Sequence, residues 1–323
     1  MPDSSLSQQP SALASEMRAY TGLFTEKTFD WDAFPASRGF PDLLRAQLRY
    51  VGAGGSPKSN DPTTLKAEHF TFSLVNQPVG KFAGSHAHEV VEHFFILQGV
   101  LTVGTVWGDE VVEVKLGPGD LLLNKSGRPH GFRNDGVEPV LMQITVGSGT
   151  PEMPVHVCHP KDKDLELARR FGAPGPEKIR LFSPDSTDRR HQELAKHVVR
   201  YRDRTPVWDK AGFARLAYVG EGGAPAHGYR MDMIHLPKGI AVKPYVRDVE
   251  DVYFVLDGAI TAGWVQDGEV VERRLGARDL LFNPAGRPHY FRNDGVTDAR
   301  FSMVVGSGAP ESVSFEAATF GGA

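Results

Sequence analysis

Apolar and polar residues alternate along much of the chain, and this period of two predicts strands rather than helices. Short alternating runs lie at residues 44–51, 70–75, 82–97, 100–115 and 140–146. The fourth run is interrupted at a Gly-Asp pair that is typical of a hairpin turn. Glycine (35 residues) and proline (23 residues) are abundant, as expected for a protein with many turns. The pattern therefore predicts an all-β protein.

A few segments depart from this alternation. Residues 162–171 and 185–198 have acidic side chains early and basic or histidine side chains late, which favours short helices. Residues 1–20 are polar, and we expect a mobile tail or a short helix that docks on a neighbour. Residues 56–66 are polar and contain proline, which predicts a surface loop.

The second half of the chain repeats the first. The run LGARDLLFNPAGRPHYFRNDG at 275–295 matches LGPGDLLLNKSGRPHGFRNDG at 116–136. The same offset of 159 residues holds without a gap over 78–152 and 237–311, and nearly half of these positions are identical. A repeat of this length predicts two similar domains. We predict an N-terminal extension at residues 1–40 and a first barrel at 41–155. A linker with short helices follows at 156–205, and a second barrel at 206–323.

Three histidines and one carboxylate in the first half form a candidate metal site. Residues i and i+2 of a strand face the same side, so His86 and His88 project together, and Glu92 can join them. His130 must come from a different strand. This ligand set suits a borderline divalent metal such as Fe, Mn, Ni, Cu, Co or Zn. Four protein ligands leave about two positions of an octahedral ion open.

The second half lacks most of these residues, because Tyr245, Arg247 and Asp251 replace its first two histidines and its glutamate. Only His289 is kept. One imidazole and a short carboxylate beside an arginine make a poor site for a divalent ion. We therefore predict one metal per chain, in the first half. The second half is predicted to be a scaffold, with an anion-binding pocket at Arg247 as the alternative.

Other chemically active residues have simpler interpretations. His93 follows Glu92 directly, so it faces away from the site and is expected to be packed or solvated. His156-Val-Cys158-His159 lies outside the candidate site and is expected to be a strand end. Aromatic and apolar residues between the histidines are candidates for the barrel core or for a pocket wall, namely Phe82, Phe94, Ile96, Trp107 and Phe132.

The spacing of the glycines and the candidate ligands carries a resemblance to a known family. Gly80-x5-His86-x-His88-x3-Glu92-x6-Gly99 resembles the first motif of the cupin superfamily. Gly119-x7-Gly127-x2-His130-x3-Asn134 resembles the second, with Lys125 where a proline is usual. The resemblance implies two tandem jelly-roll β-barrels joined by a short helical linker. It also implies that His86, His88, Glu92 and His130 are the metal ligands.

The same resemblance suggests several functions. The run from Glu92 to Gly99 is similar to quercetinase-type bicupin dioxygenases. This similarity implies an enzyme that uses O2 and a phenolic, enolic or flavonol-like small molecule, with Glu92 as a ligand that also serves as general base. Iron is the favoured metal, with Mn, Ni, Cu or Zn as alternatives. A non-redox cupin enzyme (isomerase, decarboxylase, lyase or aminohydrolase) and a non-catalytic small-molecule-binding bicupin remain the other candidates.

Charge and cysteine content limit the expected partners and the expected cellular location. The net charge is −4, so neither a nucleic acid nor a membrane is expected as a partner. The single cysteine, Cys158, excludes an internal disulfide and favours a cytoplasmic location. No apolar run is typical of a signal peptide or a membrane span. Cupin barrels commonly pair, so we expect a homo-oligomer.

Overall fold

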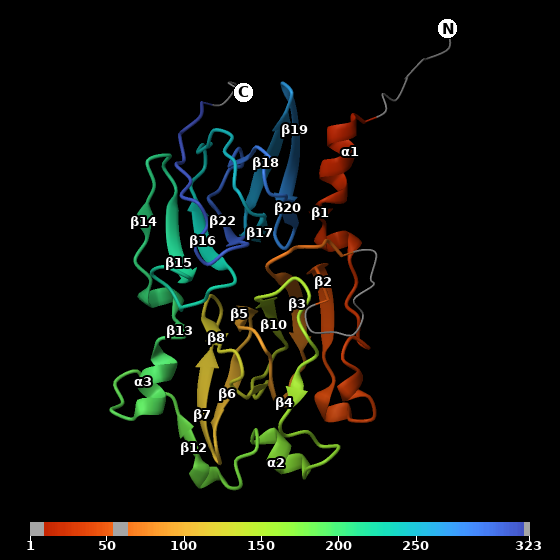
Figure 1. Cartoon of the computed structure of the whole chain (residues 1–323), viewed down its shortest axis with the longest axis vertical. Coiled ribbons are helices and arrows are strands. Elements are labelled where there is room, and N and C mark those ends of the chain that lie inside the picture. Colours follow the sequence, from red (N-terminus) through yellow and green to blue (C-terminus); the bar gives the residue numbers. More distant parts are fainter. Residues whose placement is uncertain (1–9, 54–63, 320–323) are drawn as a thin grey trace.

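Two β-barrels stacked along the long axis make up the molecule (Figure 1). The computed structural model describes residues 10–53 and 64–319. Each barrel consists of two sheets that face one another around an apolar core. All the paired strands are antiparallel apart from one short pair in the first barrel. The predicted fold class, a tandem pair of jelly-roll barrels, is confirmed.

The first barrel contains two six-stranded sheets, of order β13-β8-β5-β10-β3-β2 and β11-β4-β9-β6-β7-β12. The strands of the alternating sequence runs form their centres, and residues from the linker add the edge strands β11, β12 and β13. The strands of this barrel are β2 (Ala46–Val51), β3 (Thr71–Gln77), β4 (Phe82–Ala87), β5 (Glu92–Gln98), β6 (Leu101–Trp107), β7 (Glu110–Leu116), β8 (Leu121–Asn124), β9 (His130–Arg133), β10 (Val140–Val146), β11 (Val155–His156), β12 (Ile179–Leu181) and β13 (Val198–Val199).

The second barrel has a seven-stranded sheet, of order β1-β20-β17-β22-β16-β15-β14, and a three-stranded sheet, of order β19-β18-β21. Its central pairings repeat those of the first barrel at the offset seen in the sequence. The strands are β1 (Thr21–Gly22), β14 (Val207–Trp208), β15 (Ala214–Val219), β16 (Arg230–Leu236), β17 (Asp251–Asp257), β18 (Ala259–Gln266), β19 (Glu269–Gly276), β20 (Leu280–Asn283), β21 (His289–Arg292) and β22 (Ala299–Val305).

The N-terminal extension crosses to the far barrel. Helix α1 (Ala12–Ala19) lies beside β19, and the short strand β1 pairs with β20 (Figure 1). The expected short helix is therefore present, and it docks on the second barrel of its own chain. The first nine residues of the chain and most of the loop predicted at 56–66 fall outside the described residues. Within the described ranges, no helix combines the length and apolar character needed to cross a bilayer.

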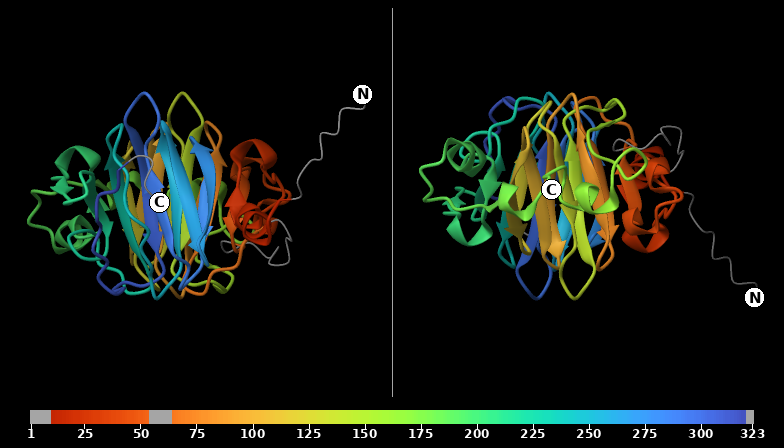
Figure 2. Two further views of the ribbon diagram at one scale, coloured as in Figure 1. Left: turned by 90° about the horizontal axis from the view of Figure 1, so that it is seen from above. Right: turned by 90° about the horizontal axis from the view of Figure 1, so that it is seen from below.

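Part of the linker lies on the side of the first barrel opposite the N-terminal extension, and part covers the lower end of this barrel (Figures 1 and 2). Its helices α2 (Leu165–Arg169) and α3 (Arg189–Ala195) are shorter than the predicted ones. After α2 the chain turns sharply at Phe171, which has a positive φ of 60°. The ring of Phe171 packs over Gly104 and Gly131, where any side chain would collide with it. The remaining short elements are the 3-10 helices η1 (Phe24–Glu26), η2 (Pro35–Ser37), η3 (Pro41–Leu43), η4 (Pro176–Lys178) and η5 (Tyr201–Asp203).

The two barrels share an apolar interface. The rings of Tyr50 and Phe254 lie 5.8 Å apart between centroids, and those of Phe95 and Tyr218 lie 5.4 Å apart. All four side chains are buried in one cluster that draws residues from both barrels. Burial of large aromatic side chains dominates the energetics of such contacts. The barrels therefore form a single packed body.

Candidate metal centre

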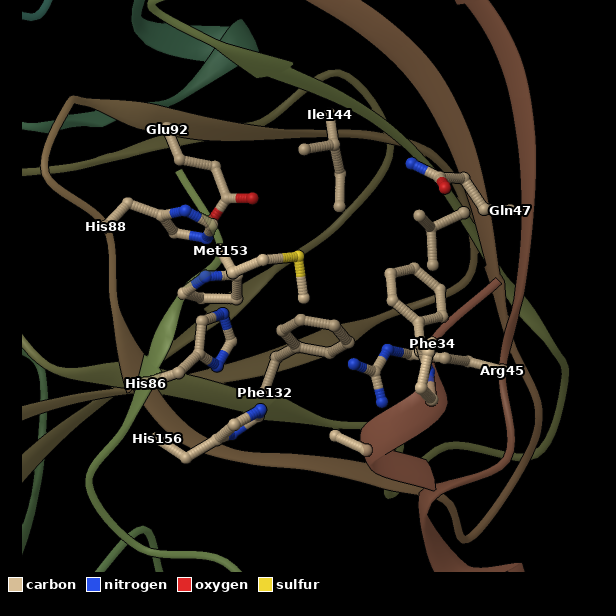
Figure 3. A pocket seen from close by; sticks show the side chains of 14 residues that line it. Phe34, Arg45, Gln47, His86, His88, Glu92, Phe132, Ile144, Met153 and His156 are labelled. Atoms are coloured by element: carbon tan, nitrogen blue, oxygen red, sulfur yellow. The ribbon is translucent and has the colours of Figure 1, made fainter. Parts of the chain in front are cut away.

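Three elements of the first barrel bring the candidate ligands together. His86 lies near the end of β4 and is paired in register with His130, the first residue of β9. Glu92 is the first residue of β5, and His88 precedes it in the turn after β4. The alternation of side chains directs His86 of β4 into the barrel, and the turn that follows carries His88 to the same space. Figure 3 shows His86, His88 and Glu92 converging on the same space.

The four ligand groups form one compact cluster. One ligand atom from each of His86, His88, Glu92 and His130 can be chosen so that all four lie within 4.8 Å of one another, and all four residues are buried. The carboxylate Oε2 of Glu92 lies 3.0 Å from Nε2 of His130 and 3.5 Å from Nε2 of His88. Ligand atoms on opposite sides of a divalent ion are separated by about 4 Å. The cluster therefore has the dimensions of a mononuclear site.

Backbone hydrogen bonds fix which nitrogen of two of the rings can bind a metal. Nδ1 of His86 lies 2.9 Å from the carbonyl oxygen of Gly84, and Nδ1 of His130 lies 2.9 Å from that of Arg128. A carbonyl oxygen only accepts, so each Nδ1 donates to it, and each Nε2 is the ring nitrogen left for the cluster. Hydrogen bonds of this kind orient metal-binding histidines.

The protonation states also suit a metal. Burial, together with the neighbouring imidazoles of His130 and His88, holds the pKa of His86 well below its usual range. Burial by itself would raise the pKa of Glu92, but the three imidazoles around it lower that pKa to about 2. His86 is thus neutral and Glu92 is ionised at neutral pH. These are the forms in which imidazole and carboxylate bind metals.

Several buried polar atoms around the cluster have no hydrogen-bond partner among the described residues. They include Nδ1 of His88, Oγ1 of Thr105 and both side-chain polar atoms of Asn124. Asn124 pairs with Glu92 across β8 and β5, and Thr105 pairs with His130 across β6 and β9. Buried polar groups are almost always satisfied in folded proteins. Their concentration here fits a site that holds an ion with water or substrate.

A cavity of about 50 Å³ opens beside the cluster. His86, His88 and Glu92 form its polar wall, and Phe132 and Ile144 form part of the apolar wall (Figure 3). Since one water needs roughly 10–15 Å³ of such volume, the cavity has room for only a few waters or a small molecule. The other residues that line it are Phe34, Pro35, Ala36, Arg45, Gln47, Val75, Met153, Pro154 and His156.

In the second barrel an arginine lies beside the carboxylate that corresponds to Glu92. Nε of Arg247 lies 2.8 Å from Oδ2 of Asp251, and Nε2 of His289 lies 3.2 Å from the same oxygen. Arg247 and Asp251 are both buried. The guanidinium of Arg247 therefore supplies the positive charge beside the carboxylate of Asp251, and both residues belong to the second barrel. This ion pair argues against the anion-binding alternative for Arg247.

Around this ion pair the second barrel carries larger side chains that are paired with one another. Trp264 stands at the position of Thr105, and its Nε1 donates to Oδ1 of Asn283 over 2.8 Å. The amide of Asn283 in turn donates to Asp251 over 2.7 Å. The rings of Tyr245 and Phe315 pack 4.9 Å apart between centroids. The side chains of Trp264 and Asn283 thus satisfy one another, in contrast to Thr105 and Asn124 of the first barrel.

The other residues singled out from the sequence lie largely as expected. His93 is fully buried and points away from the site, with Nδ1 2.6 Å from the hydroxyl of Tyr229 in the other barrel. His156 is the last residue of the short strand β11, but it also lines the cavity. Among the aromatic candidates, Phe132 lines the cavity, whereas Phe82 and Phe94 are buried in the core.

Sequence reasoning missed Arg45, whose guanidinium projects into the cavity (Figure 3). It lies outside both glycine-framed motifs, immediately before β2. The repeat could have revealed it. Leu48 and Tyr50 correspond to Leu216 and Tyr218, and the same alignment places Arg45 opposite a phenylalanine in the second half.

Comparison with known proteins agrees with this architecture. The cupin domain model matches residues 73–147 and 232–305. A curated relative, the dimethylsulfoniopropionate lyase DddQ of Ruegeria pomeroyi, is 33% identical over 81 residues, which cover 25% of this chain and 39% of the relative. The chain thus matches about two fifths of the length of that relative.

Solved structures give the same fold over nearly the whole chain. A variant of oxalate decarboxylase from Bacillus subtilis aligns with 91% of this chain and 79% of its own, at 16% identity and a TM-score of 0.62. A second structure of that enzyme, from work on its Mn(II) centres, aligns with 92% of this chain and 79% of its own, at 15% identity and a TM-score of 0.61. At this identity the likeness establishes the fold alone.

Proposed function

We propose that this chain, which belongs to the cupin superfamily and carries a cupin domain in each half, is a metal-dependent enzyme that acts on a small organic molecule in its first barrel. The observation that carries the proposal is the position of the ligand cluster. His86, His88 and Glu92 form one wall of a cavity, so a molecule inside it would meet the ion directly. The second barrel, with its internal Arg247–Asp251 pair, is a scaffold.

A bound divalent ion would act as a Lewis acid that polarises an oxygen of the substrate. The residues of the chain do the rest. Hydrogen bonds to backbone carbonyls hold the rings of His86 and His130 in place. The ionised carboxylate of Glu92 can accept a proton from a substrate hydroxyl or water. The apolar side chains of Phe132 and Ile144 limit access of water and so strengthen these electrostatic interactions.

We favour a non-redox reaction, such as elimination or decarboxylation, over dioxygenation. The cavity, with room for the centres of only a few water-sized molecules, favours a small substrate. The curated relative is a lyase, and the solved structures of the same fold are a decarboxylase. Dioxygenation remains the second candidate, because a set of three histidines and one glutamate leaves adjacent positions for substrate and O2. Mn and Fe both suit this ligand set.

Metal analysis and oxygen uptake test the proposal together. The purified protein is reloaded with Mn(II) or Fe(II), its metal content is measured, and small carboxylic acids and enols are offered with and without O2. The expected result is about one metal per chain and turnover that is equal in the two atmospheres. Turnover that consumes O2 in step with substrate would establish the dioxygenase instead. Metal binding without turnover of any compound would favour a non-catalytic binding protein.

A further inference from the structure

Arg45 is a buried cation in the cavity wall. Its exposed fraction is 9%, and it lines the same cavity as His86, His88 and Glu92. Figure 3 shows its guanidinium on the side of the cavity away from these residues. A charged side chain in such a place is costly unless it has a partner. The position of Arg45 therefore requires an explanation.

Neighbouring residues hold the guanidinium in one orientation. The ring of Phe34 lies 4.1 Å from it, and the ring of Phe132 lies 5.9 Å away on the cavity side. Nη1 donates to Oγ of Ser37 over 3.1 Å and to the carbonyl oxygen of Leu43 over 3.2 Å. The ring of Phe34 and the two hydrogen bonds from Nη1 thus hold the planar guanidinium in place. An arginine fixed in this way is prepared to bind a planar anion through two parallel hydrogen bonds.

No carboxylate of residues 10–53 or 64–319 forms an ion pair with Arg45. The other two arginines that are buried in these ranges differ in this respect. Arg49, four residues along the same strand face, pairs with Asp30 over 3.2 Å, and Arg247 pairs with Asp251 over 2.8 Å. Burial lowers the pKa of Arg45 and the negative charge of Glu92 at the other end of the cavity raises it; the result is about 10, so Arg45 is still a cation at neutral pH. Its positive charge faces the cavity.

The repeat shows that the fold does not need an arginine here. Ala46 and Leu48 of β2 correspond to Ala214 and Leu216 of β15, as their pairings with β3 and β16 confirm. Arg45 therefore corresponds to Phe213, which is fully buried in the core of the second barrel. At this position, a cation is present only in the barrel that has the candidate metal ligands. This distribution points to function rather than folding.

Charge gives the class of ligand. Imidazole binds a metal in its neutral form, so three histidines and one glutamate around a divalent ion would leave one net positive charge, and Arg45 adds a second. The cavity would thus present two positive charges, one at each end, within a small apolar space. A small molecule with a carboxylate at one end and a second oxygen ligand at the other matches this arrangement.

We propose that Arg45 binds the carboxylate of the substrate, and that the substrate is therefore a small carboxylic acid held between Arg45 and the metal centre. This inference rests on the proposed function, since it places the substrate in the same cavity. It assigns Arg45 a role in specificity, because a neutral analogue would leave the guanidinium buried and unpaired.

Binding to the Mn(II)-loaded protein tests the inference without an activity assay. The probes are acetate, pyruvate and lactate, with propane-1,2-diol as the neutral analogue of lactate, and titration calorimetry measures their affinities. We compare wild type with Arg45→Met and Arg45→Lys. Arg49→Met is the matched control, because it removes a buried arginine of the same strand that already has a carboxylate partner. Metal content and circular dichroism are recorded for every variant.

The expected result is that at least one carboxylate binds to wild type and that Arg45→Met weakens it by about tenfold or more. Arg45→Lys should recover part of the affinity, and the diol should bind equally weakly to all variants. Metal content should stay at the wild-type value. The inference fails if no carboxylate binds to the metal-loaded wild type, or if Arg45→Met binds it as tightly as wild type does.

Two further outcomes have distinct meanings. If Arg45→Met fails to fold, Arg45→Lys still decides, because the point charge of lysine cannot reproduce two parallel hydrogen bonds and should bind more weakly than arginine. Unchanged carboxylate affinity in that variant would overturn the inference. If wild type takes up no metal at all, the proposed function fails first. That failure is visible in the metal content and is therefore separate from a failure at Arg45.

Discussion

The hydroxyl of Tyr218 donates a hydrogen bond to the carbonyl oxygen of Gly119 over 2.8 Å, and this bond joins the second barrel to the first. The opposite half of the interface repeats it. There the hydroxyl of Tyr50 donates over 2.5 Å to the carbonyl oxygen of Arg278, which stands at the position of Gly119 in the second barrel. The two barrels are thus fastened by a reciprocal pair of bonds, as expected when similar domains meet about a pseudo-twofold axis.

Removal of either hydroxyl should weaken this interface. Each of Tyr50→Phe and Tyr218→Phe leaves a partly buried carbonyl without its donor and should lower the free energy of unfolding by about 1 kcal/mol. Urea denaturation measures the change. Tyr201→Phe, at a partly exposed tyrosine, is the control and should change stability by less than about 0.5 kcal/mol. Equal losses in all three variants would mean that the two bonds between the barrels contribute nothing specific.

The metal site should depend on the first barrel alone. His86→Ala and His130→Ala each remove one ligand and should reduce the metal content from about one equivalent to nearly none, while the circular dichroism spectrum stays that of wild type. His289→Ala removes the corresponding histidine of the second barrel and should leave the metal content unchanged. Elemental analysis by mass spectrometry gives the answer. Full metal content in His130→Ala would refute the site.

Arg247 should matter for stability and not for metal. Arg247→Ala leaves the carboxylate of Asp251 buried without its cation, so we expect a loss of about 3–5 kcal/mol in the free energy of unfolding. Metal content should be that of wild type. Chemical denaturation and elemental analysis of the same preparation check both points. A large loss of metal would show that the second barrel contributes to the site after all.

The ion pair of Asp251 should also shape the response to acid. Burial alone would raise the pKa of Asp251, but His289 and Arg247 lower it below its usual value. A carboxyl whose pKa is depressed by folding adds stability above its unfolded pKa of about 4, and this stability is lost as the pH falls. Wild type should therefore be more stable than Asp251→Asn at neutral pH, and the difference should shrink below about pH 4. A difference that is constant with pH would contradict this account.

Self-association remains a prediction from the sequence. Cupin barrels commonly pair through their faces, so sedimentation velocity should show a homo-oligomer at micromolar protein concentration. The matching control is a dilution series, because a specific assembly dissociates at a defined concentration. Sedimentation as a monomer at every concentration would contradict the prediction.

Most of the fold could be read from the sequence because its signals are local. Alternation predicted the hairpin of β6 and β7, and the gapless repeat predicted the second barrel. The linker helices were predicted too long. Charge distribution favours helix over 162–171, but the contact of Phe171 with two glycines of the barrel ends α2 early. Such tertiary contacts outweigh local preference and leave no local pattern in the sequence.

The candidate ligands were also predictable, since the spacing of His86, His88 and Glu92 on strands decides where they point. The cavity was not. Arg45 reaches the site from a strand edge about forty residues earlier in the chain, and no spacing rule connects it to His86. The sequence placed Asp251 beside Arg247, but it did not reveal that the two are buried as an ion pair. The packing of segments that are distant in sequence decides which charged groups lie in contact and which lie apart.

The pairing of β1 with β20 has a consequence for how the protein is made. Thr21 leaves the ribosome well before its strand partner Leu281, because both barrels and the linker between them account for most of the chain from one to the other. During synthesis the edge of β1 therefore has no native partner until β20 of the second barrel is available. A fragment that starts at the linker would lack β1 and expose the backbone of β20 as a free edge, which invites aggregation. The barrels are consecutive in sequence, yet neither can be excised cleanly as a module.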